Sequence, residues 1–271
     1  MAAPPFQPPS QQRRTEAATA RPDGAAAGAV RCGVCGTESR QPPFRPPPPE
    51  QAPDLDLRPG EPVRGTMALW LQQCPHCGYA APDIGRAHPG AAAAVSAAPF
   101  RALLAETSYP LLARRFLAWA HVLEETGALH AAAEATLQAA WVADDLNRPD
   151  LARAWRREAV ALWRAGPPLD PEQTVRVVDA LRRAQAWDDA LATAEALARS
   201  RPPEPVAQVI GLERRLVEAR DSGRHTLASA LPPPARRPHV SHQRPPALGS
   251  SAGLGFGGLF ERLRRFLRRG G

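Results

Sequence analysis

The chain has 271 residues, with 34 basic against 27 acidic side chains and a formal net charge of +7. Its 32 prolines crowd the two ends and are few between Phe100 and Arg201, so the foldable part is long enough for one or two domains. Arg, Glu or His interrupts every alanine-rich stretch before it reaches 18 apolar residues, which argues against a membrane-spanning helix.

The positive charge is concentrated near the C-terminus. From Arg224 to Gly271 there are nine arginines against Glu261 alone, a net charge of +8, which leaves about −1 for residues 1 to 223. A basic chain often binds nucleic acid. Because the rest of this chain is nearly neutral, the charge distribution argues against nucleic acid as the partner of its folded part.

Residues 1 to 29 are rich in Pro, Ala and Gln and have little apolar surface to bury, so we expect them to be disordered. They lack the charged start and apolar run of a secretory signal. The sequence therefore predicts a cytoplasmic protein whose cysteines are reduced.

The four cysteines form two C-x-x-C-G turns with 38 residues between them. Zn²⁺ binds four thiolates tetrahedrally, and a gap of two residues lets one tight turn supply two of them. The glycine after each pair tolerates the positive φ that such a turn needs. We predict one structural Zn²⁺ in a zinc-ribbon-like module over residues 30 to 90, with the ligands Cys32, Cys35, Cys74 and Cys77.

Two other interpretations of the cysteines are open. A thiol oxidoreductase would use one C-x-x-C pair beside a βαβ pattern, which this sequence lacks. A disulfide scaffold would need an oxidising compartment. His76 lies between two of the predicted ligands, and we interpret it as a solvated turn residue.

The segment between the cysteine pairs contains QPPFRPPPPEQAPDLDLRPGEP, residues 41 to 62. Its prolines exclude a helix or an interior strand and favour an extended conformation. It could be a stiff loop inside the zinc module or a docking site for an aromatic groove. The following TMALWLQQ predicts a strand entering the second turn. Metal binding would supply most of the stability of so small a module, on the order of 10 kcal/mol.

From Ala98 onward, Ala, Leu, Arg, Glu and Trp follow a helical period. The turn signals predict a mainly α fold, a tetratricopeptide-like antiparallel array over residues 98 to 230. An internal repeat, which aligns Gly127 with Gln185 and Ala132 with Ala190, supports this. The expected helices cover residues 99–106, 109–126, 128–146, 149–165, 171–185, 187–200 and 205–222. Nothing between Gly78 and Ala98 predicts an element that ties the array to the zinc module, so we expect residues 98 to 230 to fold without the head.

After the array, residues 231 to 253 form a proline-rich linker and residues 254 to 271 a basic amphipathic helix. One face of this helix is apolar (Leu259, Phe260, Leu263, Phe266 and Leu267) and the other carries five arginines (Arg262, Arg264, Arg265, Arg268 and Arg269). Such a helix could lie on an anionic membrane surface, at the inner membrane, or it could fold back on the body or bind an acidic groove of a partner.

Residues 30 to 225 resemble the bacterial family called domain of unknown function 2225. The resemblance rests on the C-x-x-C-G turns, the D-L-D-x-R-P element at residues 54 to 59, the run LWLQQCPHCGYAAPDI and LQAAWVADDL in the helical region. It implies a cytosolic bacterial protein with a zinc-ribbon-like head, its cysteines at the family's positions, and a tetratricopeptide-like body. It implies no activity. The first turn reads CGVCG where the family usually has CPxCG.

The sequence contains no H-E-x-x-H and no phosphate-binding loop. We therefore predict an interaction scaffold rather than an enzyme, in which zinc fixes a head against a helical repeat whose concave face holds a protein or peptide. The alternatives are a nucleic-acid-associated zinc ribbon, whose binding would fall steeply with salt, and a thiol oxidoreductase with a reactive, low-pKa cysteine.

Overall fold

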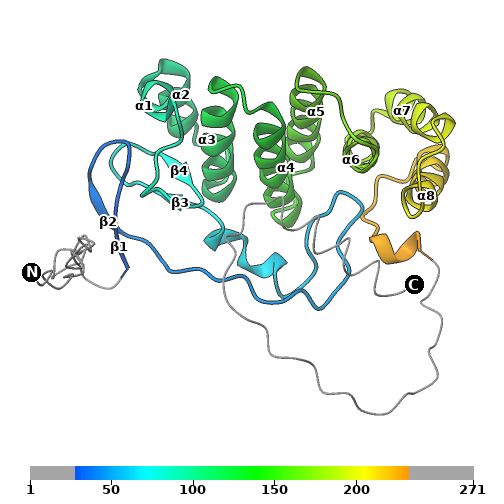
Figure 1. Ribbon diagram of the computed structural model, residues 1–271, viewed down its shortest axis with the longest axis horizontal. Coiled ribbons are helices and arrows are strands. Elements are labelled where there is room, and N and C mark those ends of the chain that lie inside the picture. Colours follow the sequence, from blue (N-terminus) through cyan, green and yellow to red (C-terminus); the bar gives the residue numbers. More distant parts are fainter. Residues whose placement is uncertain (1–27, 232–271) are drawn as a thin grey trace, which may run out of the picture.

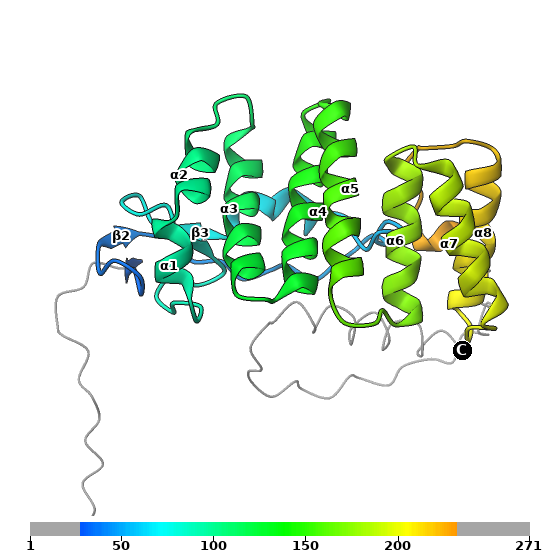
Figure 2. The ribbon, with the colours of Figure 1, turned by 90° about the horizontal axis from the view of Figure 1, so that it is seen from above.

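A computed structural model of the chain describes residues 28 to 231. A small head of two β-hairpins lies at one end, and helices follow it in a row (Figures 1 and 2). The predicted mainly α fold is confirmed. The predicted linker after Leu231, the basic helix at 254 to 271 and almost all of the predicted N-terminal disorder lie outside the described residues.

The head is made of two short antiparallel pairs. β1 (Ala29–Arg31) pairs with β2 (Glu38–Arg40), and β3 (Gln72–Gln73) pairs with β4 (Ala80–Ala81). Each hairpin carries one cysteine pair in its turn. The two halves of the predicted zinc module therefore have the same local topology.

The strand expected over TMALWLQQ forms only at its last two residues. The rest is a 3-10 helix, η1 (Arg64–Leu69), followed by Trp70, whose backbone N–H donates to the Met67 carbonyl at 3.2 Å. Because the chain turns at this point, Met67 and Trp70 lie on the same side of it, and both are buried against the helical row. The prediction of a longer strand was wrong because this apolar run packs on helices and not on a sheet.

The helical region matches the sequence prediction closely. The helix boundaries agree to within about two residues, except that the last long helix ends at Glu218 instead of 222. The structure adds α1, whose AAAAVS sequence has no side-chain cap to signal it. The helices are α1 (Ala91–Ser96), α2 (Ala98–Ala105), α3 (Leu111–Glu125), α4 (Leu129–Asp145), α5 (Pro149–Ala165), α6 (Pro171–Arg183), α7 (Trp187–Arg199) and α8 (Val206–Glu218), followed by the 3-10 helix η2 (Leu227–Ser229).

Three of the helix connections use the same tight turn. Gly127, Asn147 and Gln185 each adopt a positive φ, of 78°, 51° and 59°. The next residue then donates its N–H to a carbonyl five positions earlier, as in a Schellman motif. Gly127 and Gln185 thus occupy equivalent turns, which agrees with the internal repeat found in the sequence.

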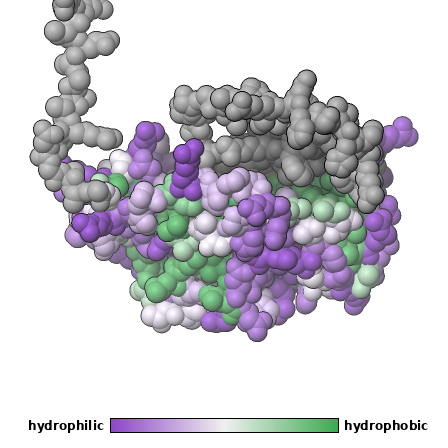
Figure 3. All heavy atoms as spheres, turned by 90° about the horizontal axis from the view of Figure 1, so that it is seen from below, coloured by the Kyte–Doolittle hydropathy of each residue, from purple (hydrophilic) through white to green (hydrophobic). Residues whose placement is uncertain are grey.

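The proline-rich segment between the cysteine pairs, which we call the insert (residues 41 to 71), runs along one side of the helical row (Figure 1). Trp70 and Met67 lie in the apolar core formed by α3, α4 and α5. Leu55 and Leu57 lie in a second core with α6, α7 and α8. Seen from the insert's side, the surface mixes hydrophilic and hydrophobic side chains (Figure 3). The insert thus packs along the array and is not a loop confined to the zinc module.

The chain after α8 returns to the insert and fixes its middle. The Leu55 N–H donates to the His225 carbonyl, and the Leu227 N–H donates to the Pro53 carbonyl, both at 2.9 Å. The head shares a core directly with α1, α2 and α3, and the insert takes part in the other two cores of the helical row. This packing favours a single folding unit. Independent folding of residues 98 to 230 stays a prediction, now with a structural argument against it.

Candidate metal centre

The four cysteine sulfurs converge in the head, within 4.8 Å of one another. Cys32 Sγ lies 3.8 Å from Cys77 Sγ, and Cys35 Sγ lies 3.6 Å from Cys74 Sγ. A disulfide would need about 2.05 Å, and all four thiols are free. A tetrahedron with Zn–S bonds of about 2.3 Å has edges of about 3.8 Å. The sulfur positions therefore fit one tetrahedral, thiolate-preferring ion such as Zn²⁺.

The two turns present their sulfurs through the same backbone geometry. The N–H of Gly36 donates to the Cys32 carbonyl at 2.8 Å, and that of Gly78 donates to the Cys74 carbonyl at 3.0 Å. Both glycines have a φ of 76°, a conformation that other residues adopt only with strain. The C-x-x-C-G spacing thus produces two matching halves of one site, as the sequence predicted.

Burial and hydrogen bonding affect the thiols differently. Burial raises the pKa of Cys32 and of Cys77. Hydrogen bonds with the side chain and then the backbone of Thr37 lower the pKa of the exposed Cys35 to about 5. Four thiolates packed this closely would repel one another, so a cation between them is needed to keep all four deprotonated.

The second cysteine turn rests directly on the helical row. Tyr79 is fully buried, and its hydroxyl donates to the Arg86 carbonyl at 3.1 Å and accepts the His88 N–H at 3.0 Å. Its ring packs edge-on against Trp119 of α3, with the two ring centroids 6.4 Å apart. The site is therefore oriented by residues that belong to the array.

The structure brings together all four predicted ligands and leaves His76 exposed, outside the sulfur cluster. Sequence reasoning missed Gln41, whose side chain joins the hairpins: its Nε2 donates to the Gln73 carbonyl at 3.0 Å, and its Oε1 accepts the Gln73 N–H at 3.4 Å. A glutamine at the start of a proline-rich stretch carries no pattern that would reveal this role.

The D-L-D-x-R-P element, one of the features behind the family resemblance, has a packing role in the structure. Asp56 and Arg58 are almost completely buried. Asp56 accepts hydrogen bonds from Trp141 at 2.7 Å and Arg183 at 3.2 Å, while Arg58 pairs with Asp145. Buried charges with such partners hold the insert against α4 and α6 and have no access to a ligand.

Comparison of the chain with protein-family models, with curated proteins and with solved structures gave no match. The resemblance to the bacterial family therefore stays a prediction. Among residues 28 to 231, no helix is long and apolar enough to cross a membrane.

Proposed function

We propose that this chain is a non-catalytic scaffold for protein interactions, in which one structural Zn²⁺ fixes the head and the insert against a helical repeat. The observation that best supports the proposal is the position of the insert. Its two ends lie at the two cysteine turns, and its middle is buried along the helical row. Closing the metal site would therefore hold the whole array in one shape.

The donor set supports a structural role for the metal. Four cysteine ligands complete a tetrahedral site and leave no open position at which a substrate or an activated water could bind. Metal-ligand bonds that join two distant parts of a chain contribute directly to folding stability. Zinc in this position would supply rigidity.

The helical row supports the interaction role, because stacked helices present long, shape-stable surfaces to protein partners. The insert already covers one side of the row with Leu55, Leu57 and Trp70. A protein partner would therefore contact the helix faces that the insert leaves open.

The proposal can be tested by photo-crosslinking in the native cell with the full chain. A crosslinking residue at the exposed positions Ala131 of α4 or Asp188 of α7 should capture a protein that the exposed Pro48 of the insert does not. The purified partner should bind the zinc-loaded chain, and Cys74→Ser should weaken that binding at least tenfold. A captured protein that binds the Cys74→Ser variant equally well would contradict the proposed link between zinc and the interaction surface. Rapid alkylation of the zinc-loaded thiols would favour an oxidoreductase instead.

A further inference from the structure

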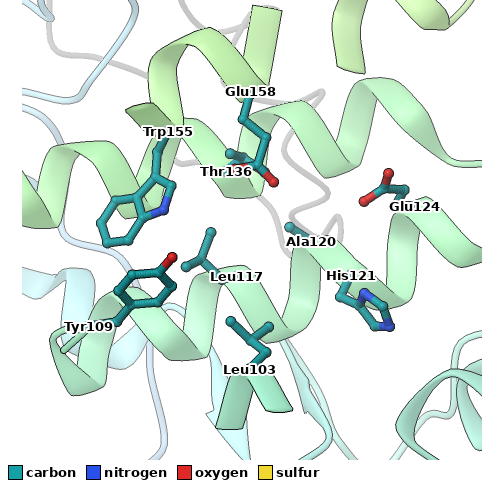
Figure 4. Close-up of a pocket in the computed structure, with 9 residues that line it drawn as sticks. All are labelled: Leu103, Tyr109, Leu117, Ala120, His121, Glu124, Thr136, Trp155 and Glu158. Carbon is teal, nitrogen blue, oxygen red and sulfur yellow. The ribbon is translucent and has the colours of Figure 1, made fainter. Parts of the chain in front are cut away.

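A cavity of about 230 Å³ opens between α3, α4 and α5 (Figure 4). Leu117 forms its floor, the rings of Tyr109 and Trp155 form one wall, and Glu124 and Glu158 stand at its mouth. The cavity is lined by α-helices of the row and by the turn before α3, and no residue of the insert contributes to it.

Besides the buried Nε2 of His121, which has no hydrogen-bond partner within residues 28 to 231, the cavity contains the polar group of Trp155. Its side chain is only 3% exposed, and its indole nitrogen points into the cavity (Figure 4). Within residues 28 to 231 its Nε1–H finds no acceptor. The ring packs edge-on against Tyr109, with the two ring centroids 5.2 Å apart. A buried indole N–H normally has a hydrogen-bond partner. The cavity therefore offers a donor that an incoming carbonyl oxygen could satisfy.

The mouth of the cavity is negatively charged. Glu124 and Glu158 come from different helices, and in the described part of the chain neither has a cationic partner. Loss of hydration raises the pKa of Glu158, and the negative charge of Glu124 adds to this effect. Two carboxylates held near each other in this way would be stabilised by a cation between them.

An arginine side chain fits this combination of groups. Its guanidinium group can bind two carboxylates at once, and it stacks well on tryptophan and tyrosine rings. A lysine would pair less well, because its ammonium group does not match the planar geometry. If the arginine belongs to a peptide, a backbone carbonyl of that peptide can accept the Trp155 N–H.

We propose that this cavity binds the arginine-rich C-terminal segment of the same chain, residues 254 to 271. This segment alternates arginines with large apolar residues, which matches an apolar floor below an acidic mouth. At the end of the α3–α4 hairpin opposite Glu124, next to Tyr109, Leu111 is 75% exposed and Leu146 is 54% exposed, which gives apolar side chains such as Phe260 or Leu263 a second surface to contact.

The chain is long enough for this contact. The described part ends at Leu231, and the 22 residues from 232 to 253 can span up to about 70 Å when extended. Helices packed 8–10 Å apart place α4 about 40 Å from α8. A tether of this length gives a local concentration of up to about millimolar, so a weak site would still be occupied.

Limited trypsin digestion of the zinc-loaded full chain at low salt tests the proposal, with cleavage after Arg262 to Arg269 followed by mass spectrometry. A synthetic peptide of residues 254 to 271 gives the unprotected rate. We expect the segment in the intact chain to be cut at least tenfold more slowly than the peptide. The double variant Glu124→Gln/Glu158→Gln should lose this protection, and Trp155→Phe, which keeps an aromatic ring but removes the N–H, should lose part of it.

The matched control is Glu125→Gln/Glu218→Gln, which removes the same charge from exposed positions outside the cavity and should keep full protection. Circular dichroism checks that each variant is folded. Equal cleavage rates in the wild type and in the cavity variant overturn the proposal. Protection that disappears on dilution overturns it in favour of a second copy, and protection that requires anionic vesicles overturns it in favour of a membrane surface.

Discussion

Trp141 of α4 donates a hydrogen bond of 2.7 Å from its indole Nε1 to Oδ2 of Asp56, a residue 85 positions earlier in the chain. Asp56 is fully buried in the insert, and Arg183 of α6 contacts the same oxygen at 3.2 Å. Burial acts to raise the pKa of Asp56, but the charges of Arg183 and Arg156 outweigh it, so the pKa is lowered. An ionised carboxylate thus links the insert to two helices of the row.

Replacing Asp56 with Ala should destabilise the protein by about 3 to 5 kcal/mol, because it leaves the buried charge of Arg183 and the Trp141 N–H without their partner. Asp188→Ala removes an exposed aspartate of α7 and should change the free energy of unfolding by less than about 1 kcal/mol. Urea unfolding of both variants measures the difference. If the two variants have the same free energy of unfolding, Asp56 does not stabilise the packing of the insert on the array.

Asp54 should make the free energy of unfolding fall as the pH rises. This is opposite to the effect of a carboxyl group with a lowered pKa, such as Asp56. Burial, followed by the nearby charge of Asp56, raises its pKa to about 7. A carboxyl group whose folded-state pKa is raised favours folding while it is protonated, and this contribution is lost as the pH rises from about 4 to 7.

The slope from this one group is at most about 1.4 kcal/mol per pH unit. In zinc-saturated protein, Asp54→Asn should flatten the fall in stability between pH 5 and pH 8 while leaving the metal site intact. Urea unfolding at several pH values compares the two proteins. Parallel pH profiles would show that Asp54 is ionised throughout this range.

The parts of the structure that could be predicted from the sequence are the ones with local signals. The α6 helix begins where Asp170 and Gln173 cap it reciprocally, at 2.7 and 2.9 Å, and the cysteine turns follow from the C-x-x-C-G spacing. The path of the insert could not be predicted, because contacts such as that of Asp56 with Trp141 join residues with no shared periodic pattern. Arg58, which is 1% exposed, is a further case, since arginine is rarely buried and its partner Asp145 is distant in sequence.

The purified protein should contain one zinc ion per chain, since the four cysteines form one complete ligand set and no other His or Cys cluster exists among residues 28 to 231. Cys74→Ser should lose the metal. His76→Ala, which changes the exposed residue between two ligands, should keep it. Elemental analysis after dialysis gives the stoichiometry; a value near two, or full retention in Cys74→Ser, would contradict the assignment.

The fragment of residues 98 to 230 should fail to melt cooperatively. The sequence predicted that it would fold alone, but the structure places Leu55, Leu57 and Trp70 of the insert in the cores of the helical row. Without them the fragment would expose apolar surface and lose the partners of several buried charges. Circular dichroism should show helix without a sharp transition, whereas residues 28 to 231 with zinc should melt sharply. A sharp transition in the shorter fragment would restore the domain boundary at residue 98.

The contact between the second cysteine turn and α2 can be measured with a pair of glycine substitutions. Gly78 and Gly127 both have a positive φ, of 76° and 78°, so alanine introduces similar backbone strain of about 1 to 2 kcal/mol at either position. A Cβ at Gly127 meets nothing within 4 Å, whereas a Cβ at Gly78 would lie 2.2 Å from Cδ1 of Leu104.

Gly78→Ala should therefore cost about 1 to 3 kcal/mol more than Gly127→Ala, because Leu104 has to leave its rotamer or the turn has to move away from α2. Movement of the turn would also displace Cys77, so zinc should dissociate faster from Gly78→Ala than from Gly127→Ala. Adding Leu104→Ala to each variant completes a double-mutant cycle. Leu104→Ala should restore part of the stability and of the zinc retention in Gly78→Ala, but it should restore neither in Gly127→Ala. If it restores neither, the metal site and α2 are not coupled through this contact.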